Sequence, residues 1–425
     1  MAEILELTPL SYIVVLGLSL TNFAMGLLDP TIPLYLLSIG VSYSGVGVIA
    51  SARFLVVAIA SLPLALFASR IGISRILYAS GISAIVSALI LFYGHGAGSV
   101  YWFYFVAGIN EASISGPGAA ILAENHGSKR VTAFALFSAT WMIPPAIGAA
   151  VSTIWFSGNQ KEDAATYASI FPIVFYVMVI GGILFIIILL FTTKSGHTTN
   201  VETDKRLPVV DQARILFAPI IVIPLLLLTL SQFLGGAGAG ATIPFLSPYL
   251  NSLDATPGEI SLLVMIMNLS MGVATQLSAP LAKRFGDIQI YVITTILSVA
   301  TLLGIAFTNN LGLASTLYIL RGTFANMSAP IGQARMIAYI EASVRATGSA
   351  FTSTCRWIGW TMFSPISGKI IGTYGYETSF VFTSIIYIIS LLLFVYVIKS
   401  KPDLEMLAGQ HVFIDHPAVS RVNLP

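Results

Sequence analysis

The chain has very little charge. Only 9% of its 425 residues are charged, and 56% are hydrophobic. A soluble domain carries about 25% charged residues, so this chain has too little polar surface to cover a soluble protein of its size. The composition predicts that its solvent is lipid. The net charge of +2 gives no reason to expect a nucleic-acid partner.

Cysteine and histidine are also scarce. Cys355 is the only cysteine, which excludes an intrachain disulfide, a thiolate metal cluster and a CxxC redox pair. The five histidines fall in loops, near the ends of apolar runs or close to the C-terminus, so we expect no metal site within the membrane. The chain has no Gly-x-x-x-x-Gly-Lys-Ser/Thr loop to bind ATP. We therefore expect no cofactor, and no enzyme, because an intramembrane enzyme needs a nucleophile–base pair or metal ligands at depth.

The chain contains many long apolar runs. A bilayer core needs about 20 predominantly apolar residues per helix, and such runs are far too long for the strands of a barrel. Twelve runs qualify, which predicts an all-α membrane protein with twelve transmembrane helices. The predicted spans are 11–38, 43–69, 74–94, 99–124, 130–157, 166–193, 216–250, 257–283, 288–308, 312–340, 345–373 and 377–398.

Lysine and arginine gather in one set of loops, and this asymmetry predicts that these loops are cytoplasmic. The opposite loops hold essentially Lys161. Because the number of spans is even, both termini are then expected to be cytoplasmic. The polar stretch 194–215 is expected to link two six-helix bundles, formed by 1–193 and 216–398, and 399–425 to be a cytoplasmic tail.

The two predicted bundles resemble each other in sequence. Residues 35–72 align with 249–286 at a constant spacing, so that Arg70-Ile71-Gly72 matches Arg284-Phe285-Gly286. The match predicts two pseudo-symmetric six-helix bundles. Parallel repeats of this kind place a binding site near the midplane of the membrane, between the halves. The repeat also argues against a channel, because no filter-like motif accompanies it.

The pattern of spans and loops resembles the major facilitator superfamily across all twelve predicted helices. Many members carry Gly-x-x-x-Asp-Arg-x-Gly-Arg-Arg between the second and third helices, and this chain keeps Arg70 and Gly72 but has Ser69 at the aspartate. The resemblance implies gating roles for Arg70, Gly72, Arg284 and Gly286. It also implies that the first, fourth, seventh and tenth helices line a central cavity.

Two further family patterns are only partly matched. The fifth helix of antiporters often carries Gly-Pro-x-x-Gly-Gly, and residues 144–149 match half of it (Pro-Pro-Ala-Ile-Gly-Ala). This is weak support for exchange, and a proline kink with small residues for close helix packing explains the run as well. Many members have an arginine four residues before a glycine in the fourth helix, where this chain has Tyr104 before Gly108.

Five ionisable residues lie deep inside the predicted spans. A charge in hydrocarbon costs roughly 2.5–3.5 kcal/mol on insertion scales, so such residues usually face the protein interior or a wet cavity. We expect Arg53 to pair with Asp29, and Arg321 to pair with Glu111. Three arginines face two carboxylates, which leaves Arg356 for a ligand. Because the guanidinium fork suits carboxylate or phosphate, we expect an anionic solute. The five residues are Asp29, Arg53, Glu111, Arg321 and Arg356.

The remaining expectations complete a binding site. Arg53, Arg321, Arg356, Asn110, Asn268 and Trp357 are predicted to contact the solute. Asp29 and Glu111 are predicted to carry a coupling proton, since no histidine is available within a span. Gly236 and Gly238 lie in a glycine-rich stretch of the seventh helix, which Pro244 and Pro248 follow. Glycine and proline allow bends, so this helix is predicted to bend and gate the cavity, with close helix packing as the equal alternative.

We therefore expect a monomeric secondary active transporter in the cell membrane. It would move a small organic anion by alternating access and be coupled to protons, as a symporter or an antiporter. The alternative is a proton-driven exporter of amphipathic drugs or lipids, which the half-matched fifth-helix motif and the aromatic residues of the spans favour.

Overall fold

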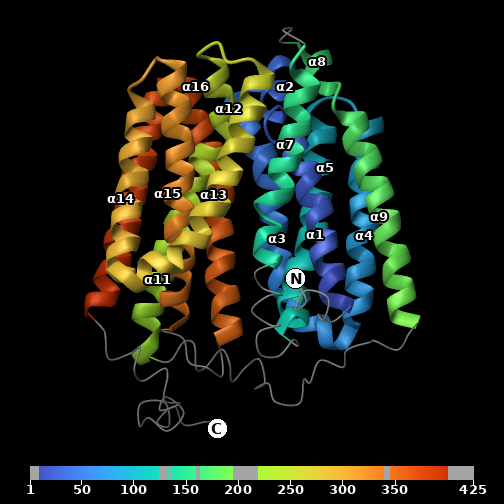
Figure 1. Ribbon diagram of the computed structural model, residues 1–425, viewed down its shortest axis with the longest axis horizontal. Helices are drawn as coiled ribbons and strands as arrows, with labels where there is room; N and C mark the ends of the chain where they lie inside the picture. Colours follow the sequence, from blue (N-terminus) through green and yellow to red (C-terminus); the bar gives the residue numbers. More distant parts are fainter. Residues whose placement is uncertain are drawn as a thin grey trace.

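The computed structural model describes residues 9–123, 133, 136–158, 163–194, 219–338 and 345–400, and each regular element in these ranges is a helix. The helices run side by side in two bundles (Figure 1). The N-half is coloured blue to green and the C-half yellow to red. The predicted linker 194–215 and tail 399–425 lie almost entirely outside the described residues.

The N-half consists of α1 (Pro9–Leu28), α2 (Ile32–Ser38), α3 (Tyr43–Ile71), α4 (Ile73–Tyr93), α5 (Gly96–Ala123), α7 (Ile143–Phe156), α8 (Ala164–Ala168) and α9 (Phe171–Lys194). The C-half consists of α11 (Pro219–Thr242), the short 3-10 helix η2 (Ile243–Phe245), α12 (Leu246–Asn251), α13 (Pro257–Phe285), α14 (Asp287–Ala306), α15 (Leu311–Ala338) and α16 (Arg345–Ser400). We call the end that carries α2, α8 and α12 the outer end, and the opposite end, with Gly72 and Gly286, the inner end (Figure 1).

Nine helical stretches of the described residues are long and apolar enough to cross a bilayer. One of them, Phe351–Ser400, contains two predicted spans, because Gly375 breaks α16 with φ 83° and ψ 174°. α5 and α15 are not among the nine, but each is a helix of 28 residues that covers most of a predicted span. Because Phe351–Ser400 counts as two spans, the nine stretches together with α5 and α15 make twelve. The prediction of twelve spans in two six-helix bundles is confirmed.

Prolines determine where the first and seventh spans break. α1 ends at Leu28 and α2 begins at Ile32, with Pro30 in the turn between them. α11 ends at Thr242 and gives way to η2, which contains Pro244 at the equivalent position. Proline lacks the N–H that a continuing helix needs. Of the glycine and proline residues from which a bend in the seventh span was expected, the break lies at the prolines, after the glycines.

An equivalent close helix contact occurs in each half. A Cβ on Gly26 of α1 would lie 2.2 Å from the carbonyl oxygen of Pro145 on α7. A Cβ on Gly240 of α11 would lie 2.4 Å from the carbonyl oxygen of Trp360 on α16. Only glycine permits this approach of two backbones. The pair of contacts supports the pseudo-symmetry that the sequence repeat predicted.

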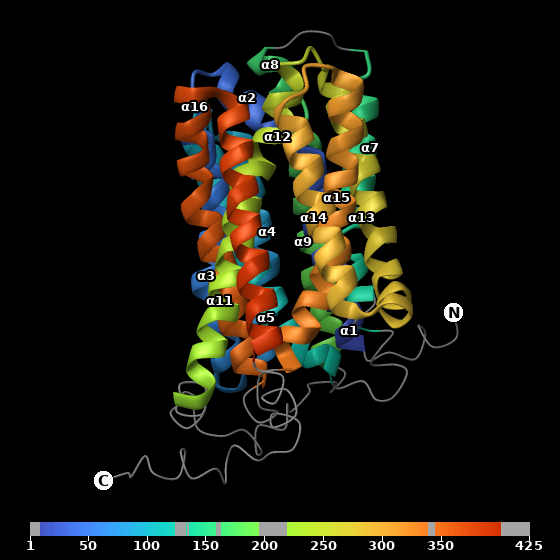
Figure 2. The ribbon, with the colours of Figure 1, turned by 90° about the vertical axis from the view of Figure 1, so that its left-hand side faces the viewer.

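Two seams join the halves toward the outer end. In one, α3 packs on α16, where the Tyr376 hydroxyl donates to that of Tyr43 at 3.1 Å. In the other, α7 packs on α13, where the hydroxyl oxygens of Ser152 and Ser261 lie 3.0 Å apart. Figure 2 shows the two seams on opposite sides of the molecule. The structure is thus a conformation in which the halves are joined at the outer end.

A cross-link tests this closure. In a background with Cys355→Ser, the double variant Ser152→Cys/Ser261→Cys should form a disulfide, since the two side chains already meet across the seam. After cleavage at a protease site engineered into 194–215, the halves should stay joined on a denaturing gel until reductant is added. The control Ser152→Cys/Ser278→Cys should separate, because Ser278 lies several turns further along α13. Equal joining of both pairs would contradict the observed seam.

Candidate functional site

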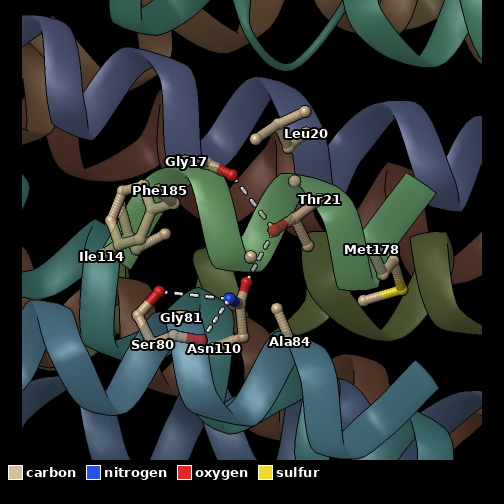
Figure 3. A pocket seen from close by; sticks show the side chains of 12 residues that line it. Gly17, Leu20, Thr21, Ser80, Gly81, Ala84, Asn110, Ile114, Met178 and Phe185 are labelled. Atoms are coloured by element: carbon tan, nitrogen blue, oxygen red, sulfur yellow. Dashed lines mark hydrogen bonds between the residues drawn. The ribbon is translucent and has the colours of Figure 1, made fainter. Parts of the chain in front are cut away.

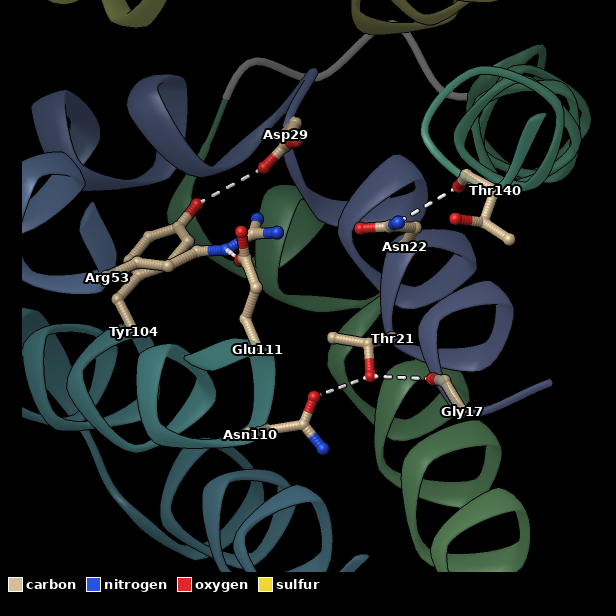
Figure 4. A network of polar contacts seen from close by, with 9 residues as sticks. All are labelled: Gly17, Thr21, Asn22, Asp29, Arg53, Tyr104, Asn110, Glu111 and Thr140. Atoms are coloured by element: carbon tan, nitrogen blue, oxygen red, sulfur yellow. Dashed lines mark hydrogen bonds and ion pairs between the residues drawn. The ribbon is translucent and has the colours of Figure 1, made fainter. Parts of the chain in front are cut away.

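Three of the five deep charges meet in the N-half (Figure 4). Arg53 on α3 donates from Nε to Oε2 of Glu111 on α5 at 2.5 Å, and their side chains are 8% and 1% exposed. A buried ion pair of this kind is costly to break, because removal of one partner leaves the other charge uncompensated. Arg53 and Glu111 therefore neutralise each other inside the N-half.

The expected pairings of Arg53 with Asp29 and of Arg321 with Glu111 are wrong. The reason is the close approach of α5 to α3 at Gly108. A Cβ there would lie 2.5 Å from the carbonyl oxygen of Arg53. Glu111 follows Gly108 by about one helical turn, so its carboxylate is brought directly to the guanidinium.

Asp29 lies in the break between α1 and α2, and its side chain is exposed. The hydroxyl of Tyr104 on α5 donates to its Oδ1 at 3.5 Å, which is long for such a bond. Asp29 makes no ion pair with any other described residue. The N-half therefore offers one carboxylate that is not neutralised by contact. The sequence did not predict Tyr104 as a contact of this site, although many family members have an arginine at this place before Gly108.

The C-half contributes two arginines. Arg321 on α15 is 4% exposed, and its Nη2 donates to the hydroxyl of Tyr387 at 2.9 Å. Its Nε is buried and has no hydrogen-bond partner. Arg356 on α16 is half-buried and lies beside Gly235 of α11. Neither arginine forms an ion pair with a described carboxylate. Nothing in the sequence pointed to Tyr387, which lies in a span with no motif.

Tyr318 lies beside Arg321 in the C-half. It is 4% exposed and lies about one turn before Arg321 on α15.

Asn110 lies away from this group, in a polar network inside the N-half (Figures 3 and 4). Its Oδ1 accepts from Thr21 at 2.7 Å, and its Nδ2 donates to the carbonyl and hydroxyl oxygens of Ser80. The network borders a cavity of about 20 Å³ between α1, α4, α5 and α9, room for about one water molecule. The amide of Asn110 is thus already occupied in this conformation, and its contact with a solute remains a prediction.

Trp357 lies at the contact between the halves. Its ring stacks on Phe54 of α3, with centroids 4.9 Å apart and planes inclined by 9°. Trp360 packs on the same Phe54 ring with centroids 4.5 Å apart, and its indole Nε1 is buried without a hydrogen-bond partner. Asn268, on α13, is buried with 9% exposure. Their contact with a solute remains a prediction.

The predicted gate residues fall into two groups. Gly72 and Gly286 have φ of 91° and 89°, which L side chains rarely adopt, so both turns need glycine. The side chain of Arg70 lies outside the described residues. Arg284 is exposed, with its guanidinium over the Phe285 ring. The sequence lacks the family aspartate in both turns. Asp287, one residue after Gly286, forms an ion pair with Arg335 of α15.

Gly236 and Gly238 lie within the regular helix α11 rather than at a bend. A Cβ on Gly236 would lie 1.9 Å from the carbonyl oxygen of Arg356, and one on Gly238 would lie 2.6 Å from the Tyr387 ring. These glycines let α16 pack closely against α11, which agrees with the alternative prediction of close helix packing. Their role in a gate remains a prediction.

Within the described ranges, no group of three His, Cys, Asp or Glu side chains is placed to hold a metal.

Comparisons with known proteins agree with this architecture. The model of the Major Facilitator Superfamily matches residues 14–230 and, a second time, residues 228–412. The structure is similar to that of the nucleoside transporter NupG, with a TM-score of 0.72 and 14% identity over 91% of this chain and 99% of that one. It is also similar to a bacterial homologue of the human lysosomal transporter Spinster, solved inward-facing and unoccupied (TM-score 0.65, 13% identity, 93% and 97% covered). No curated protein sequence matches.

The chain belongs to the major facilitator superfamily, because the family model matches both halves. It is therefore a membrane-embedded secondary transporter of a small molecule. At 13–14% identity, the two solved structures show the shared fold alone.

The ion pair of the N-half can be measured by a double-mutant cycle. Arg53→Gln and Glu111→Gln should each lower the free energy of unfolding by about 3–5 kcal/mol, because each leaves a buried charge alone. The double variant should lose less than the sum. The same cycle between Arg53 and Asp29 should give a smaller coupling, since no contact joins them. Thermal unfolding in detergent gives both values, and a larger coupling to Asp29 would contradict the structure.

Proposed function

We propose that the protein transports a small organic anion by alternating access and that protons drive the movement. The observation that carries the proposal is the pair of arginines in the C-half. Arg321 and Arg356 lie deep in the membrane span with no described carboxylate against them, while Arg53 already has Glu111. An uncompensated cation at that depth is costly, and a bound anion removes the cost.

The chemistry of the arginines favours a carboxylate or phosphate on the solute. Guanidinium groups stay charged when buried and donate two parallel hydrogen bonds to such groups. The free Nε of Arg321 adds a donor that the protein leaves without an acceptor. The hydroxyl of Tyr387 holds the other side of the same guanidinium and so fixes its orientation.

Asp29 is our candidate for the coupling proton. Loading a proton on Glu111 would break its ion pair with Arg53, whereas Asp29 has no ion pair to break. Asp29 is also exposed, so that a proton can reach it. Glu111, the other predicted carrier, then holds Arg53 in place.

The remaining proposals follow the predicted topology. The inner end, with Gly72 and Gly286, faces the cytoplasm together with both termini, and the protein works as a monomer in the cell membrane. The two seams at the outer end would open, and the inner end would close, as the halves rock about the central site.

The aromatic cluster supports a second candidate, an exporter of amphipathic drugs or lipids. Phe54, Trp357 and Trp360 offer aromatic faces close to Arg53. A thermal-shift screen against organic anions, organic cations and uncharged lipophilic compounds separates the two. Stabilisation by anions alone supports the main proposal, and stabilisation by uncharged or cationic amphipaths supports the exporter.

Arg356 provides the test of anion binding. Arg356→Ala should weaken binding of the anion found in the screen by about 10- to 100-fold, the value of one or two charge-assisted contacts. Arg356→Lys should recover only part of it, because the planar fork is lost. Lys399→Ala, at the end of α16, is the matched control and should bind normally. Unchanged affinity in Arg356→Ala, measured by calorimetry, would remove Arg356 from the site.

Asp29 provides the test of proton coupling. In vesicles, Asp29→Asn should abolish accumulation driven by a pH gradient, yet exchange of labelled for unlabelled solute should continue. Glu111→Gln should instead lower stability and reduce both activities together, because it unpairs Arg53. Full gradient-driven accumulation by Asp29→Asn would exclude Asp29 as the proton carrier.

A further inference from the structure

The two seams between the halves are packed to different closeness. In the α3–α16 seam, a Cβ on Gly47 would lie 2.4 Å from the carbonyl oxygen of Ser364. A Cβ on Gly368 would lie 2.2 Å from the carbonyl oxygen of Tyr43. Both distances are shorter than any real Cβ contact, so only glycine allows this approach. The backbones of α3 and α16 therefore touch at two points, and each half supplies one of the glycines.

Hydrogen bonds run along the same seam. The hydroxyl of Ser44 donates to the carbonyl oxygen of Pro365 at 3.2 Å. The hydroxyl of Ser51 donates to the carbonyl oxygen of Thr361 at 3.1 Å. The contacts on α16 move back along the chain as those on α3 advance, so the two helices are held antiparallel in one register.

The α7–α13 seam is looser. A Cβ on Gly258 of α13 would lie 3.5 Å from the backbone of Phe156 and Ser157 of α7, which is an ordinary van der Waals distance. An alanine would therefore fit there without moving the helices. The hydroxyl oxygens of Ser152 and Ser261 lie 3.0 Å apart in the same seam. The outer end is thus closed tightly on one side of the molecule and loosely on the other (Figure 2).

The α3–α16 seam is packed as closely as the inside of a half. Within the halves, a Cβ on Gly26 or Gly240 would lie 2.2 or 2.4 Å from a carbonyl oxygen of the neighbouring helix. An interface that has to separate during alternating access therefore uses the same packing as interfaces that stay closed. In lipid, close packing and hydrogen bonds are what hold helices together. Separation of α3 from α16 gives up both.

Resting on the proposed alternating access, we infer that the α3–α16 seam is the lock that keeps the outer end closed. Gly47 and Gly368 determine the balance between the closed and the open conformation. A Cβ at either glycine pushes α3 away from α16 in the closed conformation only, because the two backbones are apart in the open one. Alanine at either position therefore shifts the population toward an open outer end. The α7–α13 seam opens with it, because each half moves as one body.

A reporter thiol in the opposite seam tests the inference on the full chain. In a background with Cys355→Ser, the reporter is Ser152→Cys, at a position that is 0% exposed in this conformation. Its rate of alkylation by a water-soluble maleimide in detergent measures how often that seam opens. Gly47→Ala and Gly368→Ala should each raise the rate about tenfold or more, because they disfavour the closed conformation. Gly258→Ala should leave the rate unchanged.

Gly258 is a matched control, because it is also buried and also faces the backbone of the other half, but with room for a Cβ. Gel filtration and circular dichroism show whether each variant is folded. No rise in a folded glycine variant of the α3–α16 seam, or an equal rise with Gly258→Ala, overturns the lock. If neither variant folds, Ser44→Ala/Ser51→Ala removes two hydrogen bonds across the same seam and should also raise the rate. An unchanged rate there overturns the inference.

The measurement uses no solute and no pH gradient, so its outcome is separate from the anion and the proton of the proposed function. A second reporter, Ser51→Cys, lies in the α3–α16 seam itself and is 4% exposed before substitution. If Gly368→Ala speeds alkylation of this reporter but not of the one at Ser152, α3 leaves α16 without moving the halves. That result overturns the lock and leaves the proposals for Arg356 and Asp29 standing.

Discussion

The ion pair between Arg53 and Glu111 determines what every other deep charge in this protein is free to do. Because α5 closes on α3 at Gly108, these two charges meet inside the N-half and cancel. Among the described residues, Asp29 then forms no ion pair, and neither do Arg321 and Arg356. One local contact thus leaves an unpaired carboxylate in the N-half and two unpaired guanidinium groups in the C-half.

Packing of small residues holds each half together and also joins the halves. Within the halves, Gly26 meets Pro145 and Gly240 meets Trp360, backbone against backbone. Between the halves, Gly47 of α3 meets Ser364 of α16 in the same way. Lipid supplies little hydrophobic drive between helices, so such close approach is a main source of stability. At the other seam, the hydroxyl groups of Ser152 and Ser261 add a polar contact.

The sequence predicted the fold well and the site unevenly, for physical reasons. Span length and hydropathy depend on the chain alone, so twelve helices and their repeat could be read directly. Gly72 and Gly286 occupy matching positions of the sequence repeat, and both have positive φ. Partner choice depends on how helices rotate against one another, which periodicity does not give. Arg53 was thus assigned to Asp29, and Asn110 to the solute, although Thr21 and Ser80 occupy its amide.

The segregated charges also give the transporter an electrical character. Three arginines against two carboxylates leave one positive charge near the middle of the membrane. Loading the coupling proton on Asp29 would add a second positive charge, and a bound monoanion would cancel one of the two. The loaded and the empty carrier would then carry the same charge through the field. Each charge carried through the full potential is worth about 2.3 kcal/mol per 100 mV. The membrane voltage would therefore act on both movements of the carrier.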